Sequence, residues 1–341
     1  MKGRTWWAAL VAVAVSGGFG LGAETLLVYT YDSFASWGPA AALEQAFEAE
    51  HDVDVQFVAT GDSRAMLARV MAERDAGIRT ADVFVGIEAA DVARVRDLFV
   101  PLSAERLPSL AAIPEELRVD AGLSLVPYEH GWVTLVYDSE KVAEKDLPRT
   151  FDDLLDARFR RSILLEDPRT SSPGLSFLLW TIEQYGDPGY LDYWRGLLPN
   201  TLTIVQGWSE AYSLFLAGEA PIVLSFSTDT AYGVIENGSS RYRVLLLNNG
   251  AYRTIYLAGV VRGTEHSDLA LAFVDLLLSR EVQERIPTSE WMFPANPDAL
   301  LPIPFYQFAV VPPRSVMLDP ETVAQGLDRW LRDWARVVVS P

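Results

Sequence analysis

The stretch Thr201-Leu202-Thr203-Ile204-Val205-Gln206-Gly207-Trp208-Ser209-Glu210-Ala211-Tyr212 decides the fold. Residues 201–205 form an apolar, β-branched run typical of a strand, and residues 209–217 have helical spacing. Trp208 is therefore expected in a turn between a strand and a helix. Open α/β sheets bind ligands outside the carboxyl ends of their strands, at such turns. We expect the indole to stack on a flat ligand there; the alternative is packing under a neighbouring loop.

The same alternation of apolar and amphipathic runs continues along the chain. It predicts strands at residues 25–30, 53–59, 81–87, 132–137, 162–165, 201–205, 221–225, 242–247 and 255–261. It predicts helices at residues 39–50, 63–75, 151–158, 174–185, 209–217, 267–278 and 320–338. This order is typical of βαβ units, and it predicts an α/β fold with a mixed, mostly parallel sheet in each lobe.

The length of the chain, 341 residues, favours two lobes over one sheet. We expect lobe I to comprise residues 24–129 and 258–300, and lobe II residues 130–257. The chain would cross between them near residues 127–130 and 251–254, where polar or turn-forming residues separate apolar runs. Residues 301–341 would form a helical segment that packs across both lobes.

The first 23 residues are typical of a cleaved secretory signal peptide. Lys2 and Arg4 precede an apolar run at residues 6–15, and small residues lead to a cleavage point after Ala23. We therefore expect a mature protein located in the periplasm; the alternative is an uncleaved N-terminal anchor.

Composition narrows the possible functions. The chain contains no cysteine, which excludes disulfides, thiolate nucleophiles and cysteine metal sites. Removal of residues 1–23 would take two of the 28 basic residues and none of the 46 acidic ones, for a net charge of −20. This charge opposes binding to nucleic acid and favours cationic partners, although a need for solubility would also explain it.

Aromatic and hydroxyl residues gather in several other segments at strand ends. These segments are 29–34 with Tyr31, 167–174 with Ser171 and Ser172, 225–232, and 287–294 with Trp291. Each aromatic residue alone is as consistent with a core, and each serine with a helix cap. Together they favour a cleft lined with flat rings, while the hydroxyls at 170–172 could bind an anion or a hydroxyl group.

Signals for catalysis are weak. The chain has three histidines, none with the spacing of a metal site, and it contains no nucleophile-elbow, P-loop or dinucleotide-binding motif. His130 is interpreted as a hydrogen-bonding residue near a lobe crossing rather than a general base. Acidic residues are numerous, and the sequence favours no particular pair of them.

The segments 29–34, 167–174 and 207–212, together with Trp291-Met292, resemble the periplasmic thiamine-binding proteins of bacterial ABC importers. The resemblance is collinear from about residue 27 to residue 334. It implies a two-lobed Venus-flytrap protein, not an enzyme, that captures thiamine or its mono- or diphosphate. It also implies delivery of the ligand to the transmembrane subunits of an ABC permease, a monomeric state, and no cofactor or metal.

Carried over residue by residue, the resemblance places twelve residues around the ligand: Tyr31, Asp62, Ser63, Ser171, Ser172, Trp208, Phe226, Ser227, Thr228, Asp229, Tyr232 and Trp291. Three of them depart from the family pattern. Phe226 replaces a tyrosine, Asp229 a small hydroxyl residue, and Ser63 a glycine. We expect the rings of thiamine to be recognised despite these changes, and Asp229 to favour thiamine over its phosphates.

Two other classes of function remain open. One is a binder of another cation, such as a polyamine or ferric ion, although iron-binding relatives use adjacent tyrosines and this chain has no Tyr-Tyr pair. The other is an exported thiamine-processing enzyme. Thiaminase I, which resembles the same fold, depends on a cysteine nucleophile that this chain lacks.

Overall fold

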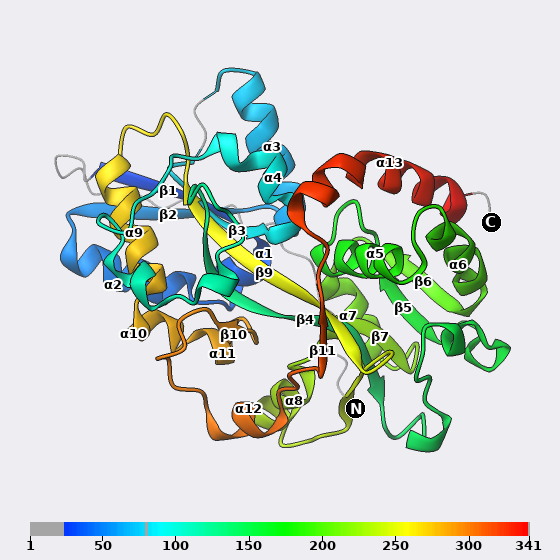
Figure 1. The fold of residues 1–341 in the computed structure, drawn as a ribbon. Helices are drawn as coiled ribbons and strands as arrows, with labels where there is room; N and C mark the ends of the chain where they lie inside the picture. Colours follow the sequence, from blue (N-terminus) through cyan, green and yellow to red (C-terminus); the bar gives the residue numbers. More distant parts are fainter. Residues whose placement is uncertain (1–23, 79–80, 340–341) are drawn as a thin grey trace, which may run out of the picture.

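The computed structural model describes residues 24–78 and 81–339 (Figure 1). The expected signal peptide, residues 1–23, lies outside the described residues. Within the described ranges, no helix is both long and apolar enough to cross a membrane.

The elements alternate as expected. The strands are β1 (Glu24–Thr30), β2 (Val53–Ala59), β3 (Val83–Glu88), β4 (Val126–Asp138), β5 (Ile163–Glu166), β6 (Thr201–Val205), β7 (Ile222–Phe226), β8 (Tyr242–Leu245), β9 (Gly250–Val260), β10 (Phe293–Pro294) and β11 (Arg314–Val316). The helices are α1 (Asp32–Ser36), α2 (Ala40–Glu50), α3 (Ser63–Asp75), α4 (Val92–Val95), α5 (Ser172–Tyr185), α6 (Gly189–Leu197), α7 (Trp208–Leu216), α8 (Asp229–Asn237), α9 (Ser267–Leu278), α10 (Arg280–Gln283), α11 (Ile286–Ser289), α12 (Ile303–Phe308) and α13 (Pro320–Val339).

The segment 151–158 is not the expected α-helix. It forms two short 3-10 helices, Asp152–Leu155 and Ala157–Phe159, which are separated by Asp156. Asp156 has an extended backbone, and its carboxylate accepts a hydrogen bond from the Arg158 amide at 2.9 Å. Because a short acidic side chain can cap a new helical turn in this way, it ends one turn and begins another.

One mixed sheet runs through the whole molecule in the order β2-β1-β3-β9-β4-β7-β5-β6. The mixed sheet is confirmed, but a single sheet joins the two lobes where one sheet in each lobe was expected, because the long strands β4 and β9 cross between them. Parallel pairing is also less dominant than expected. Among the described residues, five of the ten strand pairings are antiparallel, and each of these five includes β4 or β9. These two long strands pair with each other from Val126 opposite Ala258 to Val133 opposite Tyr252.

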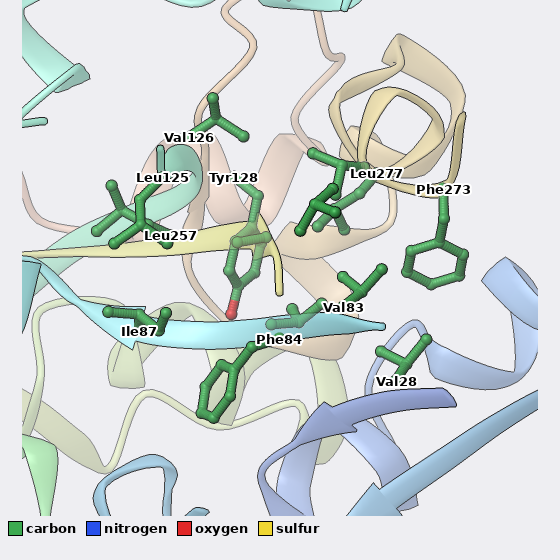
Figure 2. Packing of buried hydrophobic residues seen from close by; sticks show 14 of the residues in the cluster. Val28, Val83, Phe84, Ile87, Leu125, Val126, Tyr128, Leu257, Phe273 and Leu277 are labelled. Atoms are coloured by element: carbon green, nitrogen blue, oxygen red, sulfur yellow. The ribbon is translucent and has the colours of Figure 1, made fainter. Parts of the chain in front are cut away.

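Two hydrophobic cores flank the middle of this sheet and define two lobes. The core of lobe I is built from residues between 26 and 128 and between 255 and 295, and Figure 2 shows Tyr128 and Phe84 within it. The core of lobe II has two parts, which use residues from 132 to 252 and from 316 to 337, together with Ala90. Strands β4 and β9 pass from one lobe to the other, and residues 127–130 and 251–254 lie inside these continuous strands.

Helix α13 lies against both lobes (Figure 1). Arg94 of α4 pairs with Asp328 at 3.0 Å, and the Trp330 indole donates to Asp187 of lobe II at 3.1 Å. Trp330 and Trp334 are buried in the lobe II core, so this pair anchors the helix by packing.

Gly86 occupies a β-bulge in β3 opposite β9, with a φ of +111°. A Cβ atom at this position would lie 2.4 Å from Cδ1 of Tyr31. The bulge therefore sets the position of the Tyr31 ring, and a side chain is excluded there by contact as well as by backbone conformation.

We expect Gly86→Ala to lower the free energy of unfolding by roughly 2–4 kcal/mol, the sum of the strain of a positive φ and of overpacking. The matched control is Gly77→Ala, which has a φ of +66° but no atom within 4 Å of the added Cβ. This control should lose only about 1 kcal/mol. Urea unfolding measures both values, and equal losses would contradict the steric role of Gly86.

Candidate functional site

A cleft with about 700 Å³ of empty space, part of it open to solvent, lies between the lobes. It is lined from lobe I by Tyr31, Ser33, Trp37, Asp62, Glu129, Tyr256, Glu290, Trp291 and Met292. It is lined from lobe II by Pro173, Trp208, Phe226, Thr228, Asp229 and Tyr232. A second opening next to it shares Tyr31, Ser33, Asp62 and Trp208 and extends towards Gly207.

Eight of the twelve residues expected around a ligand line this cleft: Tyr31, Asp62, Trp208, Phe226, Thr228, Asp229, Tyr232 and Trp291. The structure thus brings together residues from both lobes that are up to 260 positions apart in the sequence. Their contact with a ligand stays a prediction.

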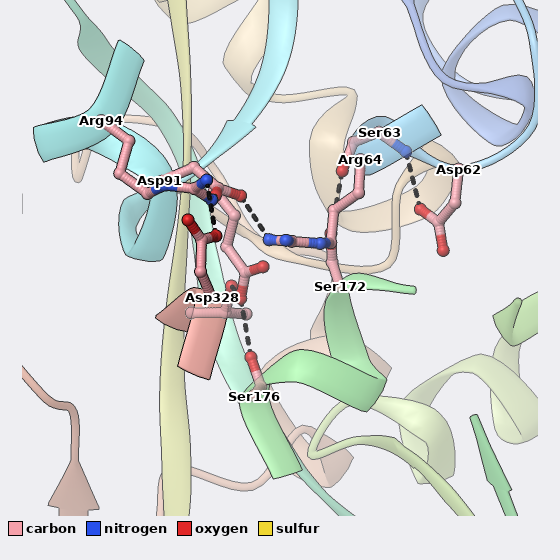
Figure 3. A network of polar contacts seen from close by, with 10 residues as sticks. Asp62, Ser63, Arg64, Asp91, Arg94, Ser172, Ser176 and Asp328 are labelled. Atoms are coloured by element: carbon pink, nitrogen blue, oxygen red, sulfur yellow. Dashed lines mark hydrogen bonds and ion pairs between the residues drawn. The ribbon is translucent and has the colours of Figure 1, made fainter. Parts of the chain in front are cut away.

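The other four expected residues, all serines, are buried behind the cleft wall. The Ser171 hydroxyl donates to Glu166 at 2.5 Å, and Ser63 shares a 2.8 Å hydrogen bond with Ser172 of the other lobe (Figure 3). Ser227 uses its backbone, whose amide donates to the Trp132 carbonyl at 2.9 Å. These serines organise the cleft wall, and the hydroxyls at 171 and 172 face protein partners.

Trp208 forms part of an aromatic wall on lobe II. Helix α7 begins at Trp208, one residue earlier than expected, after the extended Gly207. One face of the indole stacks on Tyr212, with ring centroids 4.8 Å apart and an interplanar angle of 22°. Its Nε1–H donates to the Ser225 hydroxyl at 2.8 Å. These two contacts orient the ring, and its remaining surface lines the cleft.

Trp291 faces this wall from lobe I. Its ring meets Tyr232 of α8 edge to face, with centroids 4.8 Å apart. Trp291 also has a φ of +57°, a conformation that a bulky residue rarely adopts and that is often found at functional sites. The contact between the two rings closes one end of the cleft across the lobes.

Four carboxylates, from Asp62, Glu129, Asp229 and Glu290, line the cleft together with seven aromatic rings. The lining residues include no lysine, arginine or histidine. Burial raises the pKa of Asp62 to about 6, against the opposing effect of backbone amides from Ser63 and Ser172. It raises the pKa of Asp229 to about 7, although the Ser225 hydroxyl and the Phe226 amide donate to that carboxylate.

Asp62 and Asp229 each have a defined structural setting. Asp62 caps helix α3 by accepting from the Ser63 amide at 2.9 Å, and it reaches the Ser172 amide in lobe II. Asp229 opens α8. The Ser225 hydroxyl, which lowers the pKa of Asp229, also accepts from the Trp208 indole at 2.8 Å. One aspartate therefore joins the two lobes, and the other joins the charge of the cleft to its aromatic wall.

Sequence reasoning missed Glu129, Glu290 and Tyr256. Glu129 lies within an apolar strand, where a β-bulge after Pro127 alters the alternation of side chains. Because of this bulge, the neighbours Tyr128 and Glu129 both reach the Tyr31 hydroxyl, at 3.0 and 3.1 Å. For Glu129, the polar pair at residues 129–130 within an otherwise apolar run is the only signal that the sequence offers.

His130 does not make the expected hydrogen bond. Its ring stacks on Phe293 with an interplanar angle of 14°, and its Nδ1 has no hydrogen-bond partner among the described residues. Burial, with the nearby Arg253, lowers the pKa of His130 to about 3. The imidazole is therefore neutral and acts as a packing group.

Comparison with known proteins gives this cleft a family context. Residues 78–312 match the family model described as bacterial extracellular solute-binding protein. The chain belongs to this family. The solute-binding protein is 35% identical over 316 residues to the thiamine-binding periplasmic protein of Brucella suis, covering 91% of each chain. It is 33% identical over 319 residues to the protein of the same name from Escherichia coli, covering 92% of this chain and 93% of that one.

Solved structures agree on the two-lobed fold. A structure described as a periplasmic thiamin binding protein superposes with a TM-score of 0.83 at 31% identity, covering 95% of this chain and 99% of that one. A ferric binding protein from Campylobacter jejuni superposes with a TM-score of 0.75 at 17% identity, covering 92% and 99%, and shows the fold alone.

The buried carboxyl group of Asp229 should make the stability of the ligand-free protein depend on pH. Its pKa is higher in the folded state, about 7, than the ordinary value of 3.8, so the folded state holds the proton more tightly. This contribution to stability is present at low pH and is lost as pH rises towards 7. Relative to wild type, Asp229→Asn should gain roughly 2–3 kcal/mol between pH 5 and pH 8.

Urea unfolding at the two pH values measures this gain. Asp192→Asn, at an exposed position in α6, removes the same charge outside the cleft and controls for net charge. An equal change in both variants would contradict the role of burial at Asp229.

Proposed function

We propose that this solute-binding protein captures thiamine in the interlobe cleft and delivers it to the transmembrane subunits of an ABC permease. The observation that carries the proposal is the lining of the cleft, in which four carboxylates and seven aromatic rings occur without a cationic side chain. Thiamine presents a permanent thiazolium cation and a flat aminopyrimidine. A cation over an aromatic face gains about 0.5–2 kcal/mol, and carboxylates in a water-poor cleft add attraction.

The twelve expected residues would have two roles in binding, direct contact with the ligand and support of the cleft wall. Those that line the cleft would contact the ligand, with Trp208 and Trp291 as facing aromatic surfaces from the two lobes. Asp62 and Asp229 would attract the cation or accept from the pyrimidine amine. Ser63, Ser171, Ser172 and Ser227 would support the wall from behind, because their hydroxyls are buried.

The lobe limits fit closure around a ligand. We place lobe I at residues 24–129 and 258–300, lobe II at residues 130–257, and the segment 301–341 across both. The lobe I core, built from residues 26–128 and 255–295, supports these limits except at residues 255–257, which pack with lobe I. Strands β4 and β9 and the contacts of α13 would then form the hinge region, and closure would exclude water from the cleft.

The setting of the protein is proposed from its family and relatives. The names of the relatives place them in the periplasm and describe binding, and their identity to this chain extends over nine-tenths of its length. We propose a periplasmic, monomeric binding protein that is not an enzyme. The absence of cysteine supports the last point, because the thiolate mechanism of thiaminase I needs that residue.

A polyamine is the second candidate ligand, because four carboxylates would also suit several ammonium groups. The aromatic wall favours thiamine, since flat rings stack on a flat ligand more extensively than on a flexible aliphatic chain.

Titration calorimetry with thiamine, its monophosphate, its diphosphate and spermidine separates these candidates. We expect saturable binding of thiamine with quenching of tryptophan fluorescence, and weaker binding of the diphosphate because Asp229 repels it. No response to any of the three thiamine compounds would refute the proposed function. Tighter binding of the diphosphate would refute the role of Asp229, and preference for spermidine would favour the polyamine.

Trp208→Ala should weaken thiamine binding at least tenfold, about 1.4 kcal/mol, because it removes one aromatic face. Trp208→Phe keeps a ring but loses the hydrogen bond to Ser225, and should have an intermediate effect. Leu216→Ala, at an exposed position at the end of the same helix, is the matched control. Unchanged affinity in Trp208→Ala would show that the indole only packs.

A further inference from the structure

Two carboxyl groups that the family resemblance does not assign lie together on the lobe I side of the cleft. Glu129 comes from β4, and Glu290 follows α11. The Tyr31 hydroxyl lies between them, 3.1 Å from Glu129 Oε1 and 2.7 Å from Glu290 Oε2. It is also 3.0 Å from the Tyr128 hydroxyl. We call Tyr31, Tyr128, Glu129 and Glu290 the acidic cluster.

A count of hydrogen atoms favours an additional proton in the acidic cluster. Three hydrogen-bond contacts meet at the Tyr31 oxygen, whereas the hydroxyls of Tyr31 and Tyr128 supply only two hydrogen atoms. A tyrosine hydroxyl has a single hydrogen atom, so Tyr31 can donate to only one of the two carboxylates. The other contact becomes a hydrogen bond only if that carboxyl group is protonated and donates to the Tyr31 oxygen. If both carboxyl groups were ionised, one of them would face an oxygen lone pair at hydrogen-bond distance.

The cluster is also open to a ligand on one side. Glu129 is 1% exposed and lines the cleft, and its Oε2 atom has no hydrogen-bond partner among the described residues. The buried Oε1 atom of Glu290 likewise has none in that part of the chain. Because a buried carboxylate oxygen without a partner is costly, two such atoms beside a cleft indicate a group that arrives with the ligand.

Within the described part of the chain, no cationic side chain lines the cleft beside the acidic cluster. The titratable groups that face the cluster are Tyr256 of β9, Asp62 at the start of α3 and Asp229 of α8, and none is a cation. His130, the neighbour in β4, packs against Phe293 and is neutral.

Burial is also the main cause of the raised pKa values of Glu129 and Glu290, and repulsion between the two carboxylates raises that of Glu129 further.

We propose that Glu129 and Glu290 form an acidic subsite that holds one proton while the cleft is empty and releases it when a cationic ligand binds. The inference rests on the proposed function, because it takes the ligand to be a cation such as thiamine. On binding, the carboxyl O–H bond breaks, the proton goes to solvent, and the second carboxylate is left to face the cation. The net charge of the cluster and its ligand together then stays constant, because the cation takes the place of the released proton.

Proton release makes the affinity for the ligand depend on pH. Each released proton strengthens binding tenfold per pH unit while the empty site is still protonated. Affinity should therefore rise with pH up to the raised pKa values of the cluster, and then level off.

The test compares wild type with the double variant Glu129→Gln/Glu290→Gln. Calorimetric titration with thiamine in buffers of different ionisation enthalpy counts the protons released. Asp62 and Asp229 can also release protons, so the difference between the two proteins is the quantity that matters. The double variant should release about one proton fewer per thiamine, and its affinity should change about tenfold less per pH unit.

Glu105→Gln/Glu281→Gln is the matched control, because it removes two exposed carboxylates from lobe I. It should release as many protons as wild type. Equal release by wild type and the cluster variant would overturn the inference while leaving thiamine binding intact. Failure of wild type to bind thiamine would instead refute the proposed function.

An infrared measurement tests the bound proton without any ligand. Near neutral pH, the ligand-free wild type should show a carboxylic acid C=O band that the folded cluster variant lacks. Circular dichroism confirms that the variant is folded. Identical carboxylic acid bands in the two proteins would overturn the proton assignment, whether or not thiamine binds.

Discussion

The two strands that flank β9, β3 and β4, each have a β-bulge next to the same residue of β9, and the cleft depends on this pair of bulges. The bulge at Gly86 in β3 and the bulge at Tyr128 in β4 both lie opposite Leu257. The first leaves room for the Tyr31 ring, and the second turns Tyr128 and Glu129 towards the same hydroxyl. A bulge can re-aim side chains without breaking the sheet. The strands that join the lobes thus also build the charged floor of the site.

The cleft concentrates like charge where the protein excludes water, and this arrangement costs stability when the cleft is empty. Asp62 and Asp229 have raised pKa values because burial disfavours their charged forms. Stabilising interactions elsewhere must offset this cost, and the two hydrophobic cores are the main source. A cationic ligand would relieve the same cost. Binding and stability are therefore coupled through the same carboxyl groups.

The sequence predicted those parts of the structure that depend on local periodicity. Strands β2 and β6 and helices α3 and α9 have the expected bounds, because their apolar spacing and caps agree with the tertiary environment. Eight of the twelve predicted site residues line the cleft. Glu129 and Glu290 were missed because a bulge and a sheet crossing bring them together, and neither feature has a period that can be read from sequence. The prediction of an α-helix at residues 151–158 was wrong because local capping by Asp156 outweighed the helical spacing of the segment.

The three departures that the family resemblance implies, at residues 63, 226 and 229, each have a different structural setting. Ser63 supplies a hydroxyl for the buried bond to Ser172 across the lobes, a contact that a glycine lacks. Phe226 packs beside Trp208 with ring centroids 6.4 Å apart and extends the aromatic wall. Asp229 places a buried carboxyl group near the Ser225 hydroxyl, which accepts from the Trp208 indole. Ser63 therefore affects the contact between the lobes and Phe226 the aromatic wall, while Asp229 adds a charged group to the cleft. Because the charge lies on lobe II, facing the acidic cluster of lobe I, a bound cation would be attracted from both sides and would draw the lobes together.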